Sequence, residues 1–155
     1  MEYVIGIDGG GTKTHLLAAD REMCTLFESI GGSSNLTSLN GKTVRENLTG
    51  LLHGFFKESG LPPENCVSLC LGSAGAGRES ARSELRGILK NLLPHCGIHV
   101  TDDAEGALAG VSISGSGILL IASTGSFCYG KNSFGKVFRA GGWGHVMGDE
   151  GSGYE

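Results

Sequence analysis

A strand, a glycine-rich turn and a second strand follow one another twice in this 155-residue sequence, and this repeat constrains the fold most. The first occurrence runs over residues 4–19 around three consecutive glycines at 9–11, a turn that only glycine fills comfortably. The second occurrence runs over residues 118–131 around Thr124-Gly-Ser126. Two hairpins that begin in the same way predict two similarly built lobes, of which the second is incomplete.

The segments between the two hairpins alternate between helix and strand patterns. Apolar residues recur at helical spacing over 43–59 and 81–92, and short apolar runs at 67–71 and 97–101 predict buried strands. A short helix is expected at 103–110. With a further strand before the first helix, the expected order is β-β-β-α-β-α-β-α. That order predicts an α/β fold: a mixed sheet whose first three strands are antiparallel, with helices on both faces.

This element order is that of a ribonuclease H-like lobe. We therefore predict such a lobe over residues 1–113, and the first strands of a second, similar ATPase lobe over residues 114–155. Three strands bury little surface by themselves, so the chain is interpreted as truncated and residues 117–155 are expected to pack poorly alone.

Composition excludes several classes of protein. Hydrophobic residues make up 39% and charged residues 18% of the chain, which is typical of a globular protein and of neither a disordered nor a membrane protein. The net charge of −4, without a basic run, predicts no nucleic-acid and no membrane partner. The five cysteines include no Cys-x-x-Cys pair, and a strand begins at once after the N-terminus. We expect reduced, mostly buried thiols in a cytoplasmic protein.

The first candidate site is Asp8-Gly-Gly-Gly-Thr-Lys-Thr14. Backbone N–H groups without Cβ obstruction suit phosphate oxygens, and the Asp8 carboxylate can hold Mg²⁺ through water. The residues expected to bind phosphate are Gly9, Gly10, Gly11, Thr12 and Lys13. A Walker A loop is excluded by the spacing, and a dinucleotide fingerprint by the strand that follows. The alternative is an ordinary glycine-rich hairpin.

The second candidate site is Ser123-Thr-Gly-Ser126, in the equivalent turn of the second hairpin. We expect Thr124, Gly125 and Ser126 to bind the same polyphosphate from the opposite side. Alone this turn is a weak signal, and the alternative is a turn without a ligand.

The third candidate site is Thr101-Asp-Asp-Ala-Glu105, at a strand-to-helix junction. Asp102 is interpreted as the helix N-cap, with Glu105 at the position of a capping-box partner. Asp103 is then available to accept a proton from a substrate hydroxyl. The alternative is that both aspartates only cap the helix.

The fourth candidate site is the glycine-rich loop Gly141–Ser152, which holds the only tryptophan, Trp143, and the acidic pair Asp149-Glu150. An aromatic ring beside carboxylates is typical of sugar binding, because the ring packs on C–H groups and the acids bind hydroxyls. The alternative is that Trp143 is a core residue.

Together these motifs resemble the BadF/BadG/BcrA/BcrD ATPase family of the actin/hexokinase/Hsp70 superfamily, and within it the N-acetylglucosamine kinases. The resemblance runs from Val4 to the chain end and is most specific in the loop Gly141–Ser152. It implies ATP and Mg²⁺ as cofactors. Two departures are visible: the adenosine-binding motif of the second lobe is absent, and Ala74 stands where the mammalian enzyme carries a polar residue near the sugar.

The resemblance also implies individual roles. Asp103 is the catalytic base by this resemblance, and the implied ATP phosphate contacts include Gly11, Thr12, Thr124 and Gly125. The implied sugar-binding residues are Asn35, Asp103, Gly142, Trp143, Gly144 and Asp149.

The implied activity is transfer of the γ-phosphate of ATP to the 6-hydroxyl of N-acetylglucosamine, glucosamine or a related hexose. The full-length enzyme is expected to be a homodimer, and this fragment alone to be inactive. The alternative is an ATP-dependent electron-transfer activator of an acyl-CoA dehydratase or reductase. That class needs cysteines for an iron–sulfur cluster, and Cys66-x-x-x-Cys70 is interpreted as structural. A non-catalytic sugar sensor is a third reading, against which the retention of Asp103 argues.

Overall fold

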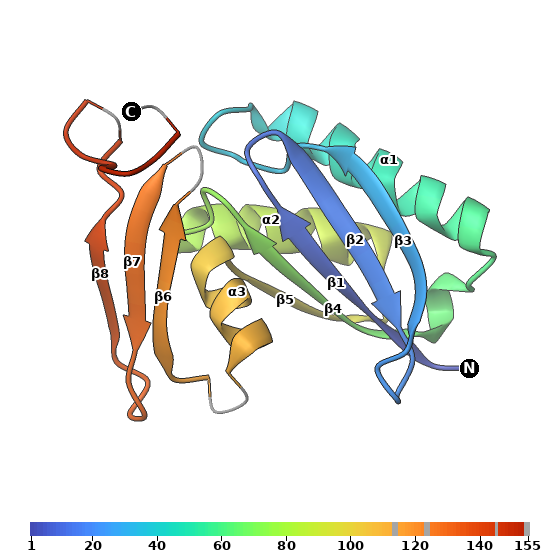
Figure 1. The fold of residues 1–155 in the computed structure, drawn as a ribbon. Helices are drawn as coiled ribbons and strands as arrows, with labels where there is room; N and C mark the ends of the chain where they lie inside the picture. The colour runs from blue at the N-terminus through green and yellow to red at the C-terminus, as the bar shows by residue number, and fades with distance from the viewer. Residues whose placement is uncertain (113–114, 123–124, 145, 154–155) are drawn as a thin grey trace. The chain divides into compact units, whose positions relative to one another are not determined.

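The computed structural model describes residues 1–112, 115–122, 125–144 and 146–153 of the chain (Figure 1). The chain separates into two compact units, Met1–Asp103 and Ala104–Glu155. The predicted division at residue 113 differs from this one. The short helix α3 (Asp103–Val111) belongs almost wholly to the second unit, because Ala104 and Leu108 pack with Tyr129 in a small core there.

The first unit is built on a five-stranded mixed sheet of order β3-β2-β1-β4-β5. Its strands are β1 (Tyr3–Gly9), β2 (Lys13–Ala19), β3 (Thr25–Gly32), β4 (Cys66–Ser73) and β5 (Gly97–Asp102). The pairs β1–β2 and β2–β3 are antiparallel, whereas β1–β4 and β4–β5 are parallel. The predicted mixed sheet and its three antiparallel leading strands are therefore confirmed.

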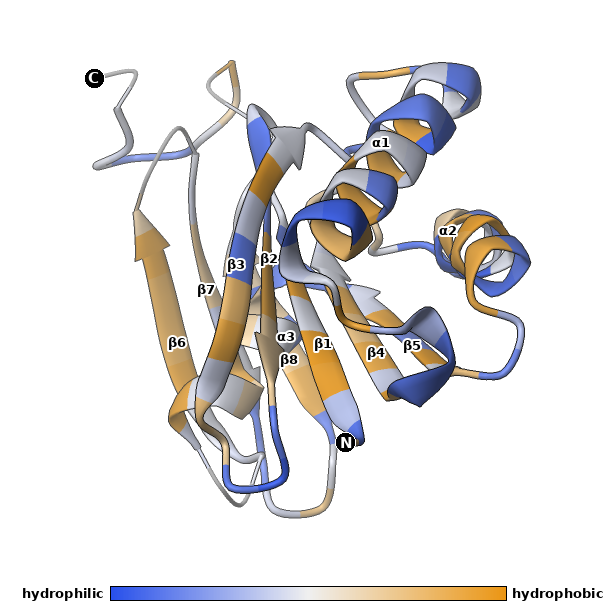
Figure 2. Cartoon of the chain, turned by 90° about the vertical axis from the view of Figure 1, so that its right-hand side faces the viewer, coloured by the Kyte–Doolittle hydropathy of each residue, from blue (hydrophilic) through white to orange (hydrophobic). Residues whose placement is uncertain are grey.

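Helices α1 (Gly41–Ser59) and α2 (Glu79–Leu92) pack against each other and lie on the same face of this sheet (Figure 2). These two helices therefore do not cover both faces as predicted, because the crossovers β3-α1-β4 and β4-α2-β5 run in the same direction along the sheet and both are right-handed. A single-turn 3-10 helix, Pro63–Asn65, precedes β4. The Asn40 side chain accepts a hydrogen bond from the Thr43 N–H and so caps α1. Gly60 ends α1 in the left-handed conformation, with φ of 67°. Local capping and the apolar period therefore agree on the bounds of α1.

The core of the first unit lies between α1, α2 and the inward face of the sheet. Most of the helical positions that the sequence pattern selected are buried, and Phe56, Ala81 and Leu92 are half-buried, which confirms the amphipathic interpretation of both helices. The largest fully buried side chains are Tyr3, Phe55, Ile5, Leu16, Leu48, Leu52, Leu69, Leu71, Leu85, Ile88, Leu89 and Val44. This core holds the strand ends, and the loops that follow them, in fixed register.

The expectation of mostly buried thiols is wrong. Cys66 and Cys96 are buried, but Cys24 and Cys70 are exposed and Cys128 is half-buried. The physical reason at Cys70 is a register shift where β1 pairs with β4, since Tyr3 pairs with Cys66 but Val4 with Ser68. Beyond this shift the residues of β4 point to the opposite face from the one that simple alternation from Cys66 would give, so Cys70 points away from the core.

The second unit contains α3 and an antiparallel sheet of strands β6 (Gly117–Ala122), β7 (Ser126–Lys131) and β8 (Val137–Gly141). One face of the sheet packs on α3 through Leu119, Ile121 and Phe127. On β6, Ile118 and Leu120 are 81% and 73% exposed. The unit thus has a small core and an uncovered apolar strand. Among the residues that the structure describes, no helix has the length and hydropathy of a membrane span.

Candidate active site

The three parallel strands of the first unit end in one row. The register pairs Gly9 of β1 with Ser73 of β4, and Ser73 with Asp102 of β5. Ligands of such sheets bind outside the carboxyl ends of the strands. The first glycine turn (residues 9–12), the loop after β4 (residues 73–77) and the Asp102-Asp103 pair therefore follow the same edge of the sheet.

The first glycine turn connects β1 to β2 as a tight hairpin, in which the Gly10 N–H donates to the Lys13 carbonyl over 2.9 Å. Thr12 and Lys13 are exposed, as is Asp8 at the end of β1. Exposed hydroxyl and ammonium donors on an unobstructed turn fit a polyphosphate, and an exposed carboxylate beside them fits a hydrated Mg²⁺. The side chains present here are therefore compatible with the expected Mg²⁺ and ATP phosphates.

Gly9 has a packing role in addition to the phosphate contact that the sequence predicts. It is buried, and a Cβ at this position would overlap the Ser34 hydroxyl and lie 3.1 Å from the Ser73 hydroxyl. Ser34 Oγ and Ser73 Oγ are 3.2 Å apart, and both serines are fully buried. The glycine therefore makes room for a buried serine pair that joins the loops after β3 and β4.

The loop after β3 (residues 33–37) contacts the first glycine turn. The Ser33 hydroxyl donates to the Gly10 carbonyl over 2.9 Å, and the Asn35 N–H donates to Ser33 Oγ over 3.2 Å. The Asn35 amide nitrogen would be 3.9 Å from a Cβ on Gly11. The predicted sugar-binding Asn35 and the predicted phosphate turn thus lie side by side.

The loop after β4 completes this group. The Ala74 N–H donates to the Gly9 carbonyl over 2.7 Å, and a Cβ on Gly75 would be 2.6 Å from Thr37 Oγ1. Gly75 has a φ of 84°, so both its conformation and its surroundings require glycine. The three loops are therefore packed together.

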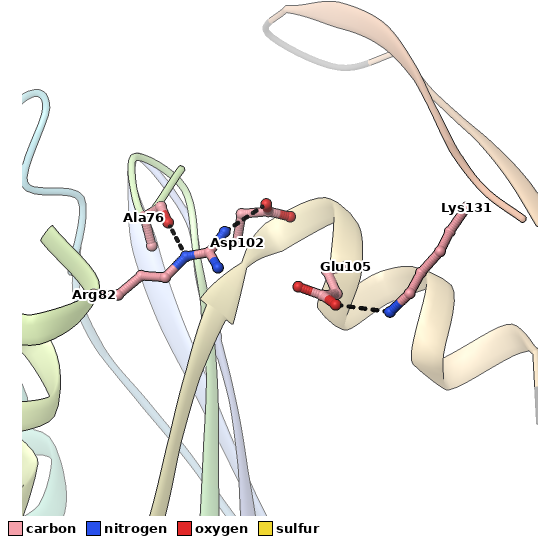
Figure 3. A network of polar contacts seen from close by, with 5 residues as sticks. All are labelled: Ala76, Arg82, Asp102, Glu105 and Lys131. Atoms are coloured by element: carbon pink, nitrogen blue, oxygen red, sulfur yellow. Dashed lines mark hydrogen bonds and ion pairs between the residues drawn. The ribbon is translucent and has the colours of Figure 1, made fainter. Parts of the chain in front are cut away.

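The Asp102-Asp103 pair lies where β5 meets α3. Asp102 is the last residue of β5, and its carboxylate forms an ion pair of 3.2 Å with Arg82 of α2 (Figure 3). Arg82 also donates to the Ala76 carbonyl over 2.6 Å. The prediction gave Asp102 only a capping role and missed Arg82, which joins the loop after β4 to the end of β5. Asp103 is the first residue of α3 and is half-buried.

Glu105, which the sequence placed in a capping box, has a further contact. Its Oε1 lies 2.9 Å from the Lys131 ammonium of β7, within the second unit (Figure 3). This ion pair joins α3 to the sheet of that unit.

The second unit brings the second glycine turn and the acidic loop together. A Cβ on Gly125 would be 2.9 Å from Asp149 Oδ2, and the Ser126 hydroxyl donates to the Glu150 carbonyl over 2.7 Å. Asp149 is buried with a positive φ of 67°, an uncommon conformation that clusters at functional sites. Ser123 and Thr124 lie outside the described residues.

Trp143 is 71% exposed, so the alternative reading as a core residue is wrong. Its neighbours Gly142 and Gly144 have φ values of 72° and 84°, which glycine adopts without strain. An exposed ring on a glycine-rich loop is compatible with sugar stacking.

Two buried side-chain oxygens lack a hydrogen-bond partner within the described part of the chain: Thr14 Oγ1 and Asp149 Oδ1. Thr14 pairs with Gly9 across β1 and β2, and is fully buried. Buried orphan oxygens are rare in proteins and tend to mark functional sites or unplaced water. Each unit therefore has one such oxygen next to its glycine turn.

Comparison with known proteins gives the family. The model of the BadF/BadG/BcrA/BcrD ATPase family matches residues 5–155. The chain belongs to this family. An N-acetylmuramic acid/N-acetylglucosamine kinase of Clostridium acetobutylicum is 43% identical over 155 residues, which cover 100% of this chain and 51% of the relative. An N-acetyl-D-glucosamine kinase of Dictyostelium discoideum is 31% identical over 171 residues, covering 99% of this chain and 51% of the relative.

A solved structure supports the same assignment. A proposed N-acetylglucosamine kinase from Chromobacterium violaceum superposes with a TM-score of 0.76 at 26% identity, covering 98% of this chain and 53% of that one. The chain thus spans about half the length of the curated relatives that it matches.

Proposed function

We propose that this chain supplies the N-terminal, ATP-binding part of a sugar kinase. The reaction transfers the γ-phosphate of ATP to the 6-hydroxyl of N-acetylglucosamine or a related amino sugar. The observation that carries the proposal is the shared strand edge, where Gly9, Ser73 and Asp102 are in register. With these strand ends side by side, the phosphate-binding turn can hold ATP next to the carboxylate that accepts the proton of the sugar hydroxyl. The two kinase relatives support the same class of activity.

Asp103 is proposed as the general base. A carboxylate at the first position of α3 is favoured in its ionised form by the helix dipole, so it can accept the proton of a sugar hydroxyl. Arg82 holds the preceding Asp102, which restricts the junction from which Asp103 projects. Because phosphoryl transfer depends mainly on positioning and electrostatics, this restraint contributes to the rate.

Phosphate binding is assigned to the two glycine turns. Thr12 and Lys13 supply donors at the first turn, while Gly125 and Ser126 are proposed for the second. Asp8 would hold Mg²⁺ through water. When bound, Mg²⁺ neutralises charge that develops on the transferred phosphate.

The sugar is assigned to Asn35, Asp103 and the loop around Trp143 and Asp149. An amide and two carboxylates provide hydrogen bonds to hydroxyls, and the exposed indole provides an apolar face for the ring. The name of one relative includes N-acetylmuramic acid, so this sugar is a candidate besides N-acetylglucosamine and glucosamine.

The electron-transfer alternative is less well supported. Cys66 is buried in the core and 3.5 Å from Cys96 between sulfur atoms, whereas Cys70 is exposed. Burial raises the pKa of the Cys66 thiol, and the Cys96 thiol beside it adds to the shift. An iron–sulfur cluster needs thiolates that reach one common point, so the buried Cys66 and the exposed Cys70 do not suit that role.

The ribonuclease H-like topology, the truncation, a homodimer and a cytoplasmic location stay predictions.

The test is ADP release by the complete protein with Mg·ATP and a panel of N-acetylglucosamine, glucosamine, N-acetylmuramic acid and glucose. We expect sugar-dependent ADP release with at least one amino sugar. Asp103→Asn should abolish it, and Glu46→Gln, which removes an exposed carboxylate of α1, should retain it. ADP release that does not depend on any sugar would contradict the proposal.

A further inference from the structure

Ser33 connects the first glycine turn to Asn35 through a single side-chain oxygen. Its side-chain hydroxyl donates to the Gly10 carbonyl over 2.9 Å, so its hydrogen points at the first glycine turn. The same oxygen accepts the Asn35 N–H over 3.2 Å. Ser33 is only 6% exposed, so little water competes for these bonds.

The backbone of Ser33 is itself held in place. Asn47 of α1 donates its side-chain N–H to the Ser33 carbonyl over 2.8 Å. A Cβ on the preceding Gly32 would be 2.8 Å from the Asn47 side-chain atoms, so the chain passes close to α1 at this point. Because the backbone is fixed on one side, a shift of the Gly10 carbonyl is transmitted to the Asn35 N–H through the hydroxyl.

We propose that Ser33 is a positioning residue that couples nucleotide binding at the first glycine turn to sugar binding at Asn35. The proposal rests on the proposed function, which assigns the two ligands, but it names a contact within the first unit that this function does not require. A nucleotide that orders the turn also orders the sugar loop through Ser33. The sugar then binds to a loop that has already lost part of its freedom, and the effect is reciprocal.

The experiment measures the affinity of the complete protein for Mg²⁺ and a non-hydrolysable ATP analogue by calorimetry, with and without saturating N-acetylglucosamine. In the wild-type protein we expect the sugar to tighten nucleotide binding by roughly fivefold or more, the usual lower range of such couplings. Ser33→Ala should bring this ratio to within about twofold of one. Ser33→Thr keeps the hydroxyl and should restore the ratio.

Ser38→Ala is the matched control. The Ser38 hydroxyl also donates to this loop, at the Asn35 carbonyl over 3.4 Å, but it is exposed, and among the described residues it forms no hydrogen bond with the glycine turn. This variant should keep the wild-type ratio. Equal loss of the ratio in Ser33→Ala and Ser38→Ala would mean that the loop is merely loosened, and would overturn the proposal.

A second measurement needs no variant and covers the case in which Ser33→Ala does not fold. In wild-type protein, the nucleotide analogue alone should slow hydrogen exchange of the Asn35 N–H, with no sugar present. Unchanged exchange, or a binding ratio of one in the wild type, overturns the coupling while leaving the kinase proposal intact. If neither ligand binds the wild-type protein, the proposed function fails as well.

Discussion

The substitution Gly9→Ala tests why the first glycine turn begins with glycine. The new Cβ would overlap Ser34 Oγ and lie 3.1 Å from Ser73 Oγ. If the Ser34 hydroxyl rotates away, its 3.2 Å contact with Ser73 is lost, which costs about 0.5–1.5 kcal/mol. If the backbone moves instead, overpacking costs about 1–3 kcal/mol. The lower entropy of the unfolded alanine chain returns about 0.4–1 kcal/mol. We expect a net destabilisation of about 1 kcal/mol.

The double variant Gly9→Ala/Ser34→Ala separates this explanation from a general loss of glycine flexibility. Ser34→Ala alone should cost about 1 kcal/mol, since Ser73 Oγ also contacts the Ser34 and Ala74 carbonyls at 3.3 and 3.2 Å. Removing the Ser34 hydroxyl also removes the overlap, so the double variant should be more stable than the sum of the single effects by about 1–3 kcal/mol.

The assay is urea unfolding of the 155-residue chain followed by far-ultraviolet circular dichroism, because the long helices α1 and α2 both belong to the first unit. Single-variant effects that add to within about 0.5 kcal/mol would refute the steric account.

Three further predictions concern the base, the buried thiol and the second unit. In the complete protein, Asp103→Asn should lower kcat by about 10²–10⁴, whereas Asp102→Asn should lower it less; steady-state kinetics that reverse this order would contradict the assignment. Burial raises the pKa of Cys66 above its ordinary value of 9.0, so the unfolded chain loses this proton first and the free energy of unfolding should fall as the pH rises above 9.0. Urea titrations across that range should show a shallower fall for Cys66→Ala, and equal slopes would count against the burial. Because Ile118 and Leu120 are 81% and 73% exposed, the chain should self-associate with concentration in sedimentation velocity, and lysines at both positions should reduce this.

The sequence was sufficient for the order of elements and for the core. Apolar periods located α1 and α2, and Asn40 and Gly60 fix the ends of α1 through backbone bonds that such residues regularly make. The first glycine turn was also predicted, because few other residues allow a hairpin so tight.

The contacts between loops could not be predicted in the same way. Ser33, Ser34 and Ser73 carry no sequence signal of their own, and become partners only because β1, β3 and β4 end at one edge. Arg82 belongs to no motif of the sequence and lies 20 residues before Asp102, yet it pairs with that carboxylate. The exposed Cys70 depends on a shift in register that the apolar run at 67–71 does not reveal. These errors concern pairings between distant residues.

The central proposal is that the complete protein transfers phosphate to the 6-hydroxyl of an amino sugar, and ³¹P nuclear magnetic resonance of the complete reaction tests it most directly. The complete protein is incubated with Mg·ATP and N-acetylglucosamine, and the products are observed without separation. We expect ADP together with one sugar phosphomonoester whose phosphorus couples to the protons on carbon 6. ADP with inorganic phosphate alone, or with a phosphoester on another carbon, would contradict it.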